Sequence, residues 1–240
     1  MPRALTVISI GGSIVVPKTG IDVAYLKNFR ACIRGLVAQR RRFIIVVGGG
    51  HTARAYQQAA AAIVRHAHDL SSSKVVKLNP EDVDWLGIHA TRLNGQLLRA
   101  LFRDIALHRV IKDPTKPVHW AEPILIAAGW KPGWSTDYVA VRLARKFKTK
   151  HIVNLTNIDA VYDKDPSRFD DAEPYDALAW SDFRKLVGDK WSPGMNAPFD
   201  PIASKLAQKW GMEVTIAAGK DLKNLKNILT GKKFKGTRIA

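Results

Sequence analysis

Three glycine-bearing segments of the sequence have the composition of phosphate-binding turns. They are Gly11-Gly12-Ser13, Gly48-Gly49-Gly50 and the stretch from Gly129 to Gly133. Glycine lets the backbone turn tightly and approach an oxygen-rich ligand, and a helix that begins there points backbone N–H groups at the same place. Two such turns side by side would hold two phosphate-bearing ligands, as phosphoryl transfer requires. The simpler alternative is that the glycines only permit tight turns between strands and helices.

Two other nucleotide-binding patterns fit the sequence poorly. Gly48-x-Gly50-x-x-Ala53 matches the dinucleotide fingerprint, but the acidic residue of that fingerprint should end the next strand. Asp69 follows an Ala-rich helical stretch instead. The Walker pattern G-x-x-x-x-G-K-[ST] does not occur in the sequence. A kinase with this sequence would therefore be of a non-P-loop kind, and a dehydrogenase is disfavoured.

Apolar runs alternate with helical spacing along the chain. The expected strands are 4–10, 43–47, 123–128, 151–155, 213–217 and a short last strand at about 236–239. The expected helices are 22–40, an Ala-rich helix to about 66, much of 81–107, a helix from Ser135 and Thr136 to about 147, 201–210 and 221–229, with loops at 69–80 and 156–179. Strands that are apolar throughout predict a mainly parallel sheet covered on both faces. Ligands of such sheets bind at the carboxyl ends of the strands, where the glycine segments fall.

Composition is that of an ordinary globular domain. The chain has 240 residues, of which 46% are hydrophobic and 25% charged, so one domain is expected. Cys32 is the only cysteine, which suits a reducing compartment. No stretch approaches the ~18 apolar residues of a membrane span, and the N-terminus has no signal-peptide pattern. We therefore expect a cytoplasmic protein without membrane partners.

The formal net charge of +17 predicts attraction to polyanions such as nucleic acid, acidic lipid or phosphorylated metabolites. The basic residues occur in several short clusters: Arg40-Arg41-Arg42, Arg145 to Lys150, Arg184-Lys185, and Lys232, Lys233 and Lys235. They either form a solvated face or bind nucleic acid. No recognised nucleic-acid module is present, so nucleic acid is not the expected partner, although the charge leaves it open.

An ordered set of motifs spanning residues 8–239 resembles the amino acid kinase superfamily, and within it the short archaeal-type uridylate (UMP) kinases. Ile10-Gly11-Gly12-Ser13 resembles the opening motif, and Val46 to Gly50 the second glycine turn. The other matching segments are Asp84 to Asn94 (D-x-x-G-x-x-x-T-x-x-N), Gly133 to Asp137 (P-G-x-[ST]-T-D), Asn154 to Tyr162, Asp163 to Pro166, Phe199-Asp200-Pro201 and Gly236-Thr237. Each motif is weak alone, whereas the ordered set is specific.

This resemblance implies an α/β protein, a three-layer α/β/α sandwich with a mainly parallel central sheet. It implies a single domain over 1–240, with an acceptor-binding part at about 1–135 and an ATP-binding part at about 136–240. The implied reaction transfers the γ-phosphate of ATP to UMP, giving UDP and ADP in pyrimidine nucleotide biosynthesis. Mg²⁺ would be held through the ATP phosphates, without an acidic metal cage of the protein. The implied assembly is a homohexamer.

The resemblance also implies roles for individual residues. The ATP-binding set comprises Gly11, Gly12, Ser13, Gly49, Arg54, Thr156, Asn157, Tyr162 and Asp165. The UMP-binding set comprises Gly48, Gly50, Asp84, Lys131, Gly133, Ser135 and Thr136. These residue types suit the chemistry, because a guanidinium grips phosphate in a bidentate way and a carboxylate accepts hydrogen bonds from ribose hydroxyls. The simpler alternatives are a surface role for Arg54, packing for Tyr162, and helix capping for Asp84 or Thr136.

Two departures from the family pattern stand out. Many superfamily members carry a lysine two residues before the first glycine, where it neutralises the transferring phosphoryl group, but this chain has Ser9. Asp200 and Lys205 are our candidate catalytic residues, with Lys131 and Lys18 as further candidates for the missing charge. Residues 64–83 also exceed the matching segment of compact relatives, as either a mobile flap or a surface loop.

Three alternatives remain open at this level. One is a kinase of the same fold acting on carbamate, acetylglutamate or isopentenyl phosphate. Asp84, together with the helix that carries Asn94, favours a nucleotide acceptor over these, because a ribose needs such a partner. The second, suggested by Ser9, is a non-catalytic nucleotide- or anion-binding protein. The third is a nucleic-acid-binding protein.

Overall fold

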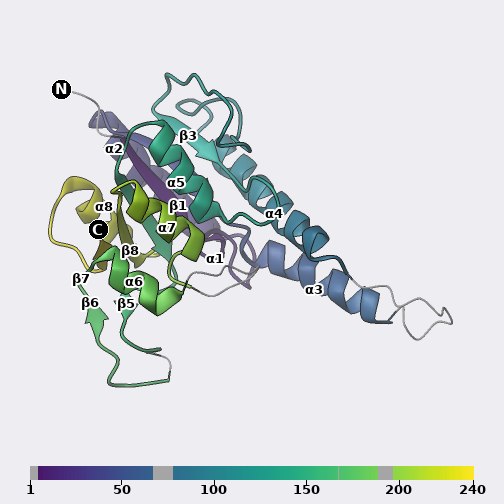
Figure 1. The fold of residues 1–240 in the computed structure, drawn as a ribbon. Helices are drawn as coiled ribbons and strands as arrows, with labels where there is room; N and C mark the ends of the chain where they lie inside the picture. Colours follow the sequence, from purple (N-terminus) through teal and green to yellow (C-terminus); the bar gives the residue numbers. More distant parts are fainter. Residues whose placement is uncertain (1–4, 67–77, 167, 189–196) are drawn as a thin grey trace.

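The computed structural model describes residues 5–66, 78–166, 168–188 and 197–240 (Figure 1). The helices are α1 (Gly12–Val15), α2 (Val23–Ala38), α3 (Gly50–His66), α4 (Pro80–Leu101), α5 (Thr136–Lys146), α6 (Trp180–Val187), α7 (Pro201–Lys209) and α8 (Leu222–Thr230). The strands are β1 (Leu5–Ile10), β2 (Arg42–Val47), β3 (Ile124–Ala127), β4 (His151–Thr156), β5 (Val161–Tyr162), β6 (Pro174–Tyr175), β7 (Ala177–Leu178), β8 (Glu213–Ala218) and β9 (Thr237–Ile239).

The described strands form a sheet in the order β3-β2-β1-β4-β8-β9-β7, and β5 pairs with β6 in a separate ribbon. Neighbouring strands from β3 to β8 are parallel, whereas β9 runs antiparallel to β8. The predicted mainly parallel sheet is therefore confirmed. β1 lies between β2 and β4, so the turn that follows β1 lies between the turns that follow its two neighbours.

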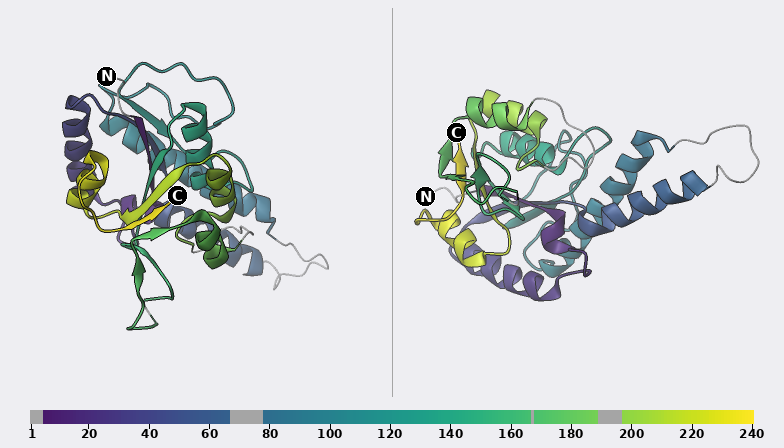
Figure 2. Two further views of the ribbon diagram at one scale, coloured as in Figure 1. Left: turned by 60° about the vertical axis from the view of Figure 1, so that its left-hand side comes forward. Right: turned by 90° about the horizontal axis from the view of Figure 1, so that it is seen from below.

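Side chains alternate between the two faces of the sheet because successive residues of a strand point in opposite directions. In β1, Ile8 and Ile10 pack with α2 and α8 on one face, and Val7 packs with α5 and α7 on the other. Both cores contain fully buried aromatic side chains, such as Phe29 of α2 and Phe199 before α7. Helices thus cover both faces of the sheet (Figure 2), and the predicted three-layer sandwich is confirmed.

Predicted helix starts coincide with side-chain caps, which satisfy backbone N–H groups of the first turn. The carboxylate of Asp22 accepts a hydrogen bond from the Tyr25 amide at 2.9 Å. Asp200 accepts one from the Ala203 amide at 2.6 Å, and Pro201 is the first helical residue of α7. At α5, Ser135 alone is the cap, and Thr136 is already inside the helix. The interpretation of Thr136 as an N-cap was therefore wrong.

The prediction was least accurate in three places. The expected loop 156–179 contains β5, β6 and β7, because strands of two residues have no periodicity to detect. The helix expected over much of 81–107 is present as α4, but it ends at Leu101, and Ala106 forms an isolated parallel bridge with Ile124. Helices α1 and α6 were not predicted.

Helices α3 and α4 run side by side and project away from the sheet (Figures 1 and 2). Residues 67–77, which connect them, lie outside the described residues. Asp69, most of the predicted loop 69–80 and the centre of the segment 64–83 therefore fall outside the description. Among the described helices, none combines the length and apolar composition needed to cross a membrane.

Candidate functional site

Two cavities open at the carboxyl ends of the parallel strands. The first, which we call the glycine cavity, has a volume of about 330 Å³ and lies at the ends of β1, β2 and β3. Its wall includes backbone of the glycine turns, at Gly12, Ser13, Gly49 and Gly50. Its predicted side-chain contributors are Arg54, Asp84, Ser135 and Thr136. Residues from three distant motifs of the sequence thus meet in one cavity.

The second cavity, which we call the β4 cavity, has a volume of about 400 Å³ and lies beyond the end of β4. Four of the nine residues predicted to bind ATP line it, namely Thr156, Asn157, Tyr162 and Asp165, which we call the adenosine set. Its far wall includes α6 residues and Pro198. The adenosine set and most of the acceptor set are therefore separated in space, although both stand at the same edge of the sheet.

The turn after β1 joins the two cavities. The Gly11 amide donates to the Leu155 carbonyl of β4 at 2.8 Å, and the Gly48 amide after β2 donates to the Ile10 carbonyl at 2.9 Å. Backbone hydrogen bonds therefore fix the β1 turn to both neighbouring turns. Ligands in the two cavities would approach one another across this turn.

The first two glycine turns are packed backbone against backbone. A Cβ atom on Gly12 would lie 2.0 Å from the Gly50 nitrogen, and one on Gly48 would lie 2.6 Å from the Gly12 nitrogen. Gly50 also has φ of +65°, a left-handed conformation that favours glycine. Tight turn packing, the simpler alternative, thus accounts for these three glycines. Because Gly12 and Gly50 also line the cavity, the same packing brings bare backbone to the ligand.

Helix α4 fixes the glycine turns through buried side chains. The Asn94 amide donates to the carbonyls of Gly48 at 2.8 Å and Gly49 at 3.1 Å. The Thr91 hydroxyl accepts from the Gly129 amide at 2.7 Å. Both side chains are more than nine-tenths buried. Asn94 therefore positions backbone that lines the cavity, a role that the motif spacing alone did not reveal.

Asp84 holds the loop that follows β3. One of its carboxylate oxygens accepts a hydrogen bond from the Gly133 amide at 2.8 Å. Gly133 and Lys131 belong to this loop but do not line the glycine cavity, and the Lys131 ammonium lies 4.5 Å from the ring centroid of Trp130. Trp134, which no sequence argument singled out, does line the cavity. Asp84 thus couples the cavity to a loop at its edge.

Ser9 belongs to a polar cluster where β1, α5 and α7 meet. Its hydroxyl donates to one Asp137 oxygen at 2.9 Å, and the Asp200 amide donates to the other at 3.2 Å. Desolvation in this packed environment, followed by the charge of Asp200, raises the pKa of Asp137 to about 7. Burial likewise raises the pKa of Asp200. The site therefore holds Asp137 close to the midpoint of its titration at neutral pH.

Asp137 was missed because the sequence motif ends on it without indicating a partner. Two features of the sequence could have indicated this contact. The order Ser135-Thr136-Asp137 places Asp137 in the first turn of α5, and the strand register brings Ser9 of β1 to that turn. In β4, Asn154 is paired with Ser9 and donates to the Pro198 carbonyl at 2.8 Å. The cluster thus connects the central strands to the segment before α7.

Side chains shape the β4 cavity. The Tyr162 hydroxyl donates to Asp159 at 2.8 Å, and the Lys235 ammonium lies 2.7 Å from the other Asp159 oxygen. The Lys235 and Tyr162 hydrogen bonds lower the pKa of Asp159 against a smaller opposing effect of burial. The Thr237 hydroxyl accepts from the Val161 amide at 2.7 Å and so anchors β5 to the last strand. The closing Gly236-Thr237 motif therefore supports the cavity without lining it.

The candidate cations are not assembled around Ser9. Lys205 is exposed on α7 and Lys18 is exposed after α1, and neither lines either cavity. Arg54 is the cation of the glycine cavity. In the described part of the chain, no group of three His, Cys, Asp or Glu side chains could hold a metal. A Mg²⁺ ion at this site would therefore take most of its ligands from phosphate and water.

Comparison with known proteins agrees with this architecture. A family model, the amino acid kinase family, matches residues 4–218. The chain is 33% identical to the uridylate kinase of Thermoplasma volcanium, over 94% of this chain and 93% of that protein. It is 32% identical to the uridylate kinase of Thermococcus kodakarensis, over 94% of this chain and 95% of that protein. The crystal structure of uridylate kinase from Archaeoglobus fulgidus matches with a TM-score of 0.77 at 28% identity, covering 98% of this chain and 99% of that chain. The predicted resemblance is confirmed, and the chain belongs to the amino acid kinase family.

Proposed function

We propose that the protein transfers the γ-phosphate of Mg-ATP to UMP, giving UDP and ADP. The observation that carries this proposal is that four residues of the predicted ATP-binding set line the β4 cavity and four residues of the predicted UMP-binding set line the glycine cavity. Four further residues of the predicted ATP-binding set also line the glycine cavity, namely Gly12, Ser13, Gly49 and Arg54, where the phosphates of the two nucleotides would meet. The likeness to uridylate kinases over nearly the whole chain supports it. In this proposal the part of the chain up to about residue 135 binds UMP, and the part from about 136 binds ATP.

Catalysis in this proposal rests on positioning and charge neutralisation. ATP occupies the β4 cavity with its phosphates directed over Gly11, Gly12 and Ser13. UMP occupies the glycine cavity, and its ribose hydroxyls donate to Asp84. Arg54 binds a phosphate group with its two-pronged guanidinium. The attacking oxygen belongs to the UMP phosphate, so no side chain has to form a covalent intermediate.

Mg²⁺, when bound through the ATP phosphates, would neutralise charge that develops during transfer. Asp200 would act by fixing the start of α7 and the Asp137 carboxyl, and Lys205 would have to turn inward to reach a phosphate. A homohexameric assembly, implied by the family resemblance, and a cytoplasmic location, expected from the sequence pattern, complete the proposal.

The direct test is ADP formation from Mg-ATP with a panel of acceptors. We expect turnover with UMP and none with carbamate, acetylglutamate or isopentenyl phosphate, and CMP and dUMP define the base and sugar selectivity. Turnover with a different acceptor would keep the fold and replace the substrate. Saturable ATP and UMP binding without turnover would instead indicate a nucleotide-binding protein, and Ser9→Lys is the variant to make in that case.

A further inference from the structure

A third cavity lies at the opposite edge of the sheet from the two ligand cavities. Its volume is about 740 Å³, within the range of small-molecule sites. Leu5, His151 and Glu213, the first residues of β1, β4 and β8, contribute to its lining. We call it the amino-edge cavity, because it lies where these strands begin. It shares no lining residue with the glycine cavity or the β4 cavity.

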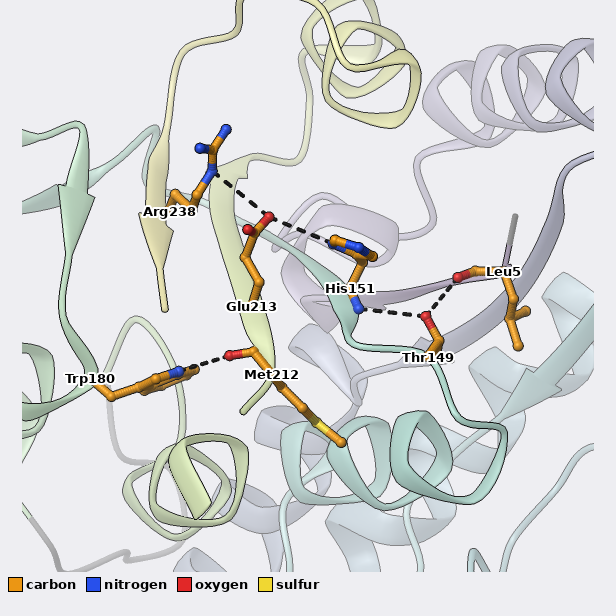
Figure 3. Close-up of polar contacts among 7 residues, drawn as sticks. All are labelled: Leu5, Thr149, His151, Trp180, Met212, Glu213 and Arg238. Carbon is orange, nitrogen blue, oxygen red and sulfur yellow. Dashed lines mark hydrogen bonds and ion pairs between the residues drawn. The ribbon is translucent and has the colours of Figure 1, made fainter. Parts of the chain in front are cut away.

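The charge of the amino-edge cavity is predominantly positive. Arg41, Lys148 and Lys150 line it, and within the described residues none of the three is in an ion pair. The one acidic residue of the lining is Glu213, which Figure 3 shows between Arg238 and His151, each 3.7 Å from the same oxygen. The carboxyl ends of α5 and α8 add only about half a negative charge each. Three full cations therefore exceed the negative charge around them.

Hydrogen bonds of Thr149 connect the backbone beneath these cations. The Thr149 hydroxyl donates to the Leu5 carbonyl at 2.7 Å and accepts a long hydrogen bond from the His151 amide at 3.5 Å (Figure 3). Thr149 and Ile152 are buried, whereas the flanking Lys148 and Lys150 are exposed. A buried residue thus separates two cations that both reach solvent at the cavity. This arrangement presents charge on a fixed backbone.

The backbone at Lys148 is also unusual. Among the described non-glycine residues, only Arg40 and Lys148 have positive φ, at 64° and 54°. Each follows the end of a helix, α2 or α5, where glycine is the favoured residue. A left-handed backbone is unfavourable for a residue with a Cβ atom, and such strain at a cation invites a functional explanation. The two residues differ in one respect, since Lys148 lines the cavity and Arg40 does not.

We propose that the amino-edge cavity binds a phosphorylated small molecule, whose phosphate groups contact Arg41, Lys148 and Lys150. The cavity is lined by both charged and apolar residues, since Phe147 and Ile228 add apolar surface beside the cations. This lining favours an organic phosphate over inorganic phosphate. The cavity explains part of the +17 charge, which the two substrate cavities leave unexplained. The proposal does not depend on the reaction that the protein catalyses.

The test is calorimetric titration of the full-length protein with inorganic tripolyphosphate at low salt. Lys148→Gly with Lys150→Ala removes two of the three cations, and glycine suits the backbone at position 148. We expect the dissociation constant of the amino-edge component to rise at least about tenfold, as for the loss of charge-assisted hydrogen bonds. Arg54→Ala, which changes the glycine cavity, leaves this component unchanged. Equal thermal unfolding midpoints establish that the variants are folded.

Arg40→Gly is the control matched to Lys148→Gly, because it removes one positive charge from the same type of helix end at a residue that does not line the cavity. We expect less than about a twofold change in the dissociation constant for this variant. Equal weakening in Arg40→Gly and the double variant would show a diffuse positive surface and overturn the proposal. Unchanged binding in the double variant, or no tripolyphosphate binding by the wild type, would also overturn it. Binding of a single-stranded decanucleotide without tripolyphosphate binding would assign the surface to nucleic acid instead.

Discussion

The glycine cavity and the β4 cavity are built in different ways. The glycine cavity is made by backbone: Gly12 and Gly50 are in contact, and Asn94 holds the adjoining carbonyls from behind. The β4 cavity is made by side chains on short strands, such as the Tyr162 and Asp159 pair. Where two backbone segments touch, there is no space for an added side-chain atom. Where a side chain forms the wall, a similar side chain can take its place. We therefore expect substitutions in the two regions to differ sharply in effect.

The largest effect is expected for Gly12→Ala. Its Cβ atom would lie 2.0 Å from the Gly50 nitrogen, so one of the two turns must move. We expect a loss of at least about 3 kcal/mol in the free energy of unfolding, together with loss of turnover. Urea unfolding and ADP formation measure the two losses. Gly35→Ala in α2, where a Cβ atom meets nothing within 4 Å, should instead stabilise by about 0.5–1 kcal/mol.

The polar cluster of Ser9, Asp137 and Asp200 should make the free energy of unfolding depend on pH. The pKa of Asp137 is about 7 in the folded protein, against 3.8 for an unperturbed aspartate, so the folded state binds more protons between these values. The stability contributed at this site is fully present below about pH 4 and falls as the pH rises to about 7, by on the order of 4 kcal/mol. Asp137→Asn keeps partners for Ser9 and the Asp200 amide.

We expect Asp137→Asn to reduce this slope in urea unfolding measured from pH 4 to 8. Part of the slope should persist in the variant, because burial also raises the pKa of Asp200. Surface carboxylates such as Asp22 and Asp104, whose pKa values are lowered by partners, are common to both proteins. Identical slopes in the two proteins would show that Asp137 is already ionised in the folded state.

A smaller loss of stability is expected when Asn94 of α4, which supports the glycine turns, is replaced. Asn94→Ala removes the side-chain donor shared by the Gly48 and Gly49 carbonyls, which should destabilise by about 1–3 kcal/mol. Turnover should fall as well, because the cavity wall is no longer fixed. Gln96→Ala on the exposed side of α4 serves as the control and should change stability by less than about 0.5 kcal/mol. A neutral Asn94→Ala would contradict the role of α4.

The smallest effect is expected in the β4 cavity. Tyr162→Phe removes one hydrogen bond to Asp159, and Lys235 continues to neutralise that carboxylate. We expect a loss of about 0.5–1.5 kcal/mol in stability and only a modest rise in KM for ATP. Steady-state kinetics with varied ATP measure this rise. A loss as large as that of Gly12→Ala would remove the distinction between the two regions.

The same distinction decided what the sequence could predict. Long apolar strands and glycine turns leave a clear pattern, so β1, β2 and the turns after them were predicted from residue types. The two-residue strands β5 and β6 are held by tertiary contacts, such as that of Thr237 with Val161, and leave no local pattern. Asp137 gains its raised pKa from burial and then from the charge of Asp200, which is far away in sequence, whereas the hydrogen bond from Ser9 lowers this pKa. Residue types could therefore name the motifs, but only the fold shows which groups they meet.

The central claim, that UMP and ATP occupy separate cavities, is tested most directly by equilibrium binding of each nucleotide to two variants. Asp84→Asn alters the glycine cavity and Asn157→Ala alters the β4 cavity. We predict that Asp84→Asn weakens UMP binding by about tenfold and leaves ATP binding within about twofold, and that Asn157→Ala does the reverse. Weakening of ATP binding by Asp84→Asn, with UMP binding unchanged, would contradict the assignment of the two cavities.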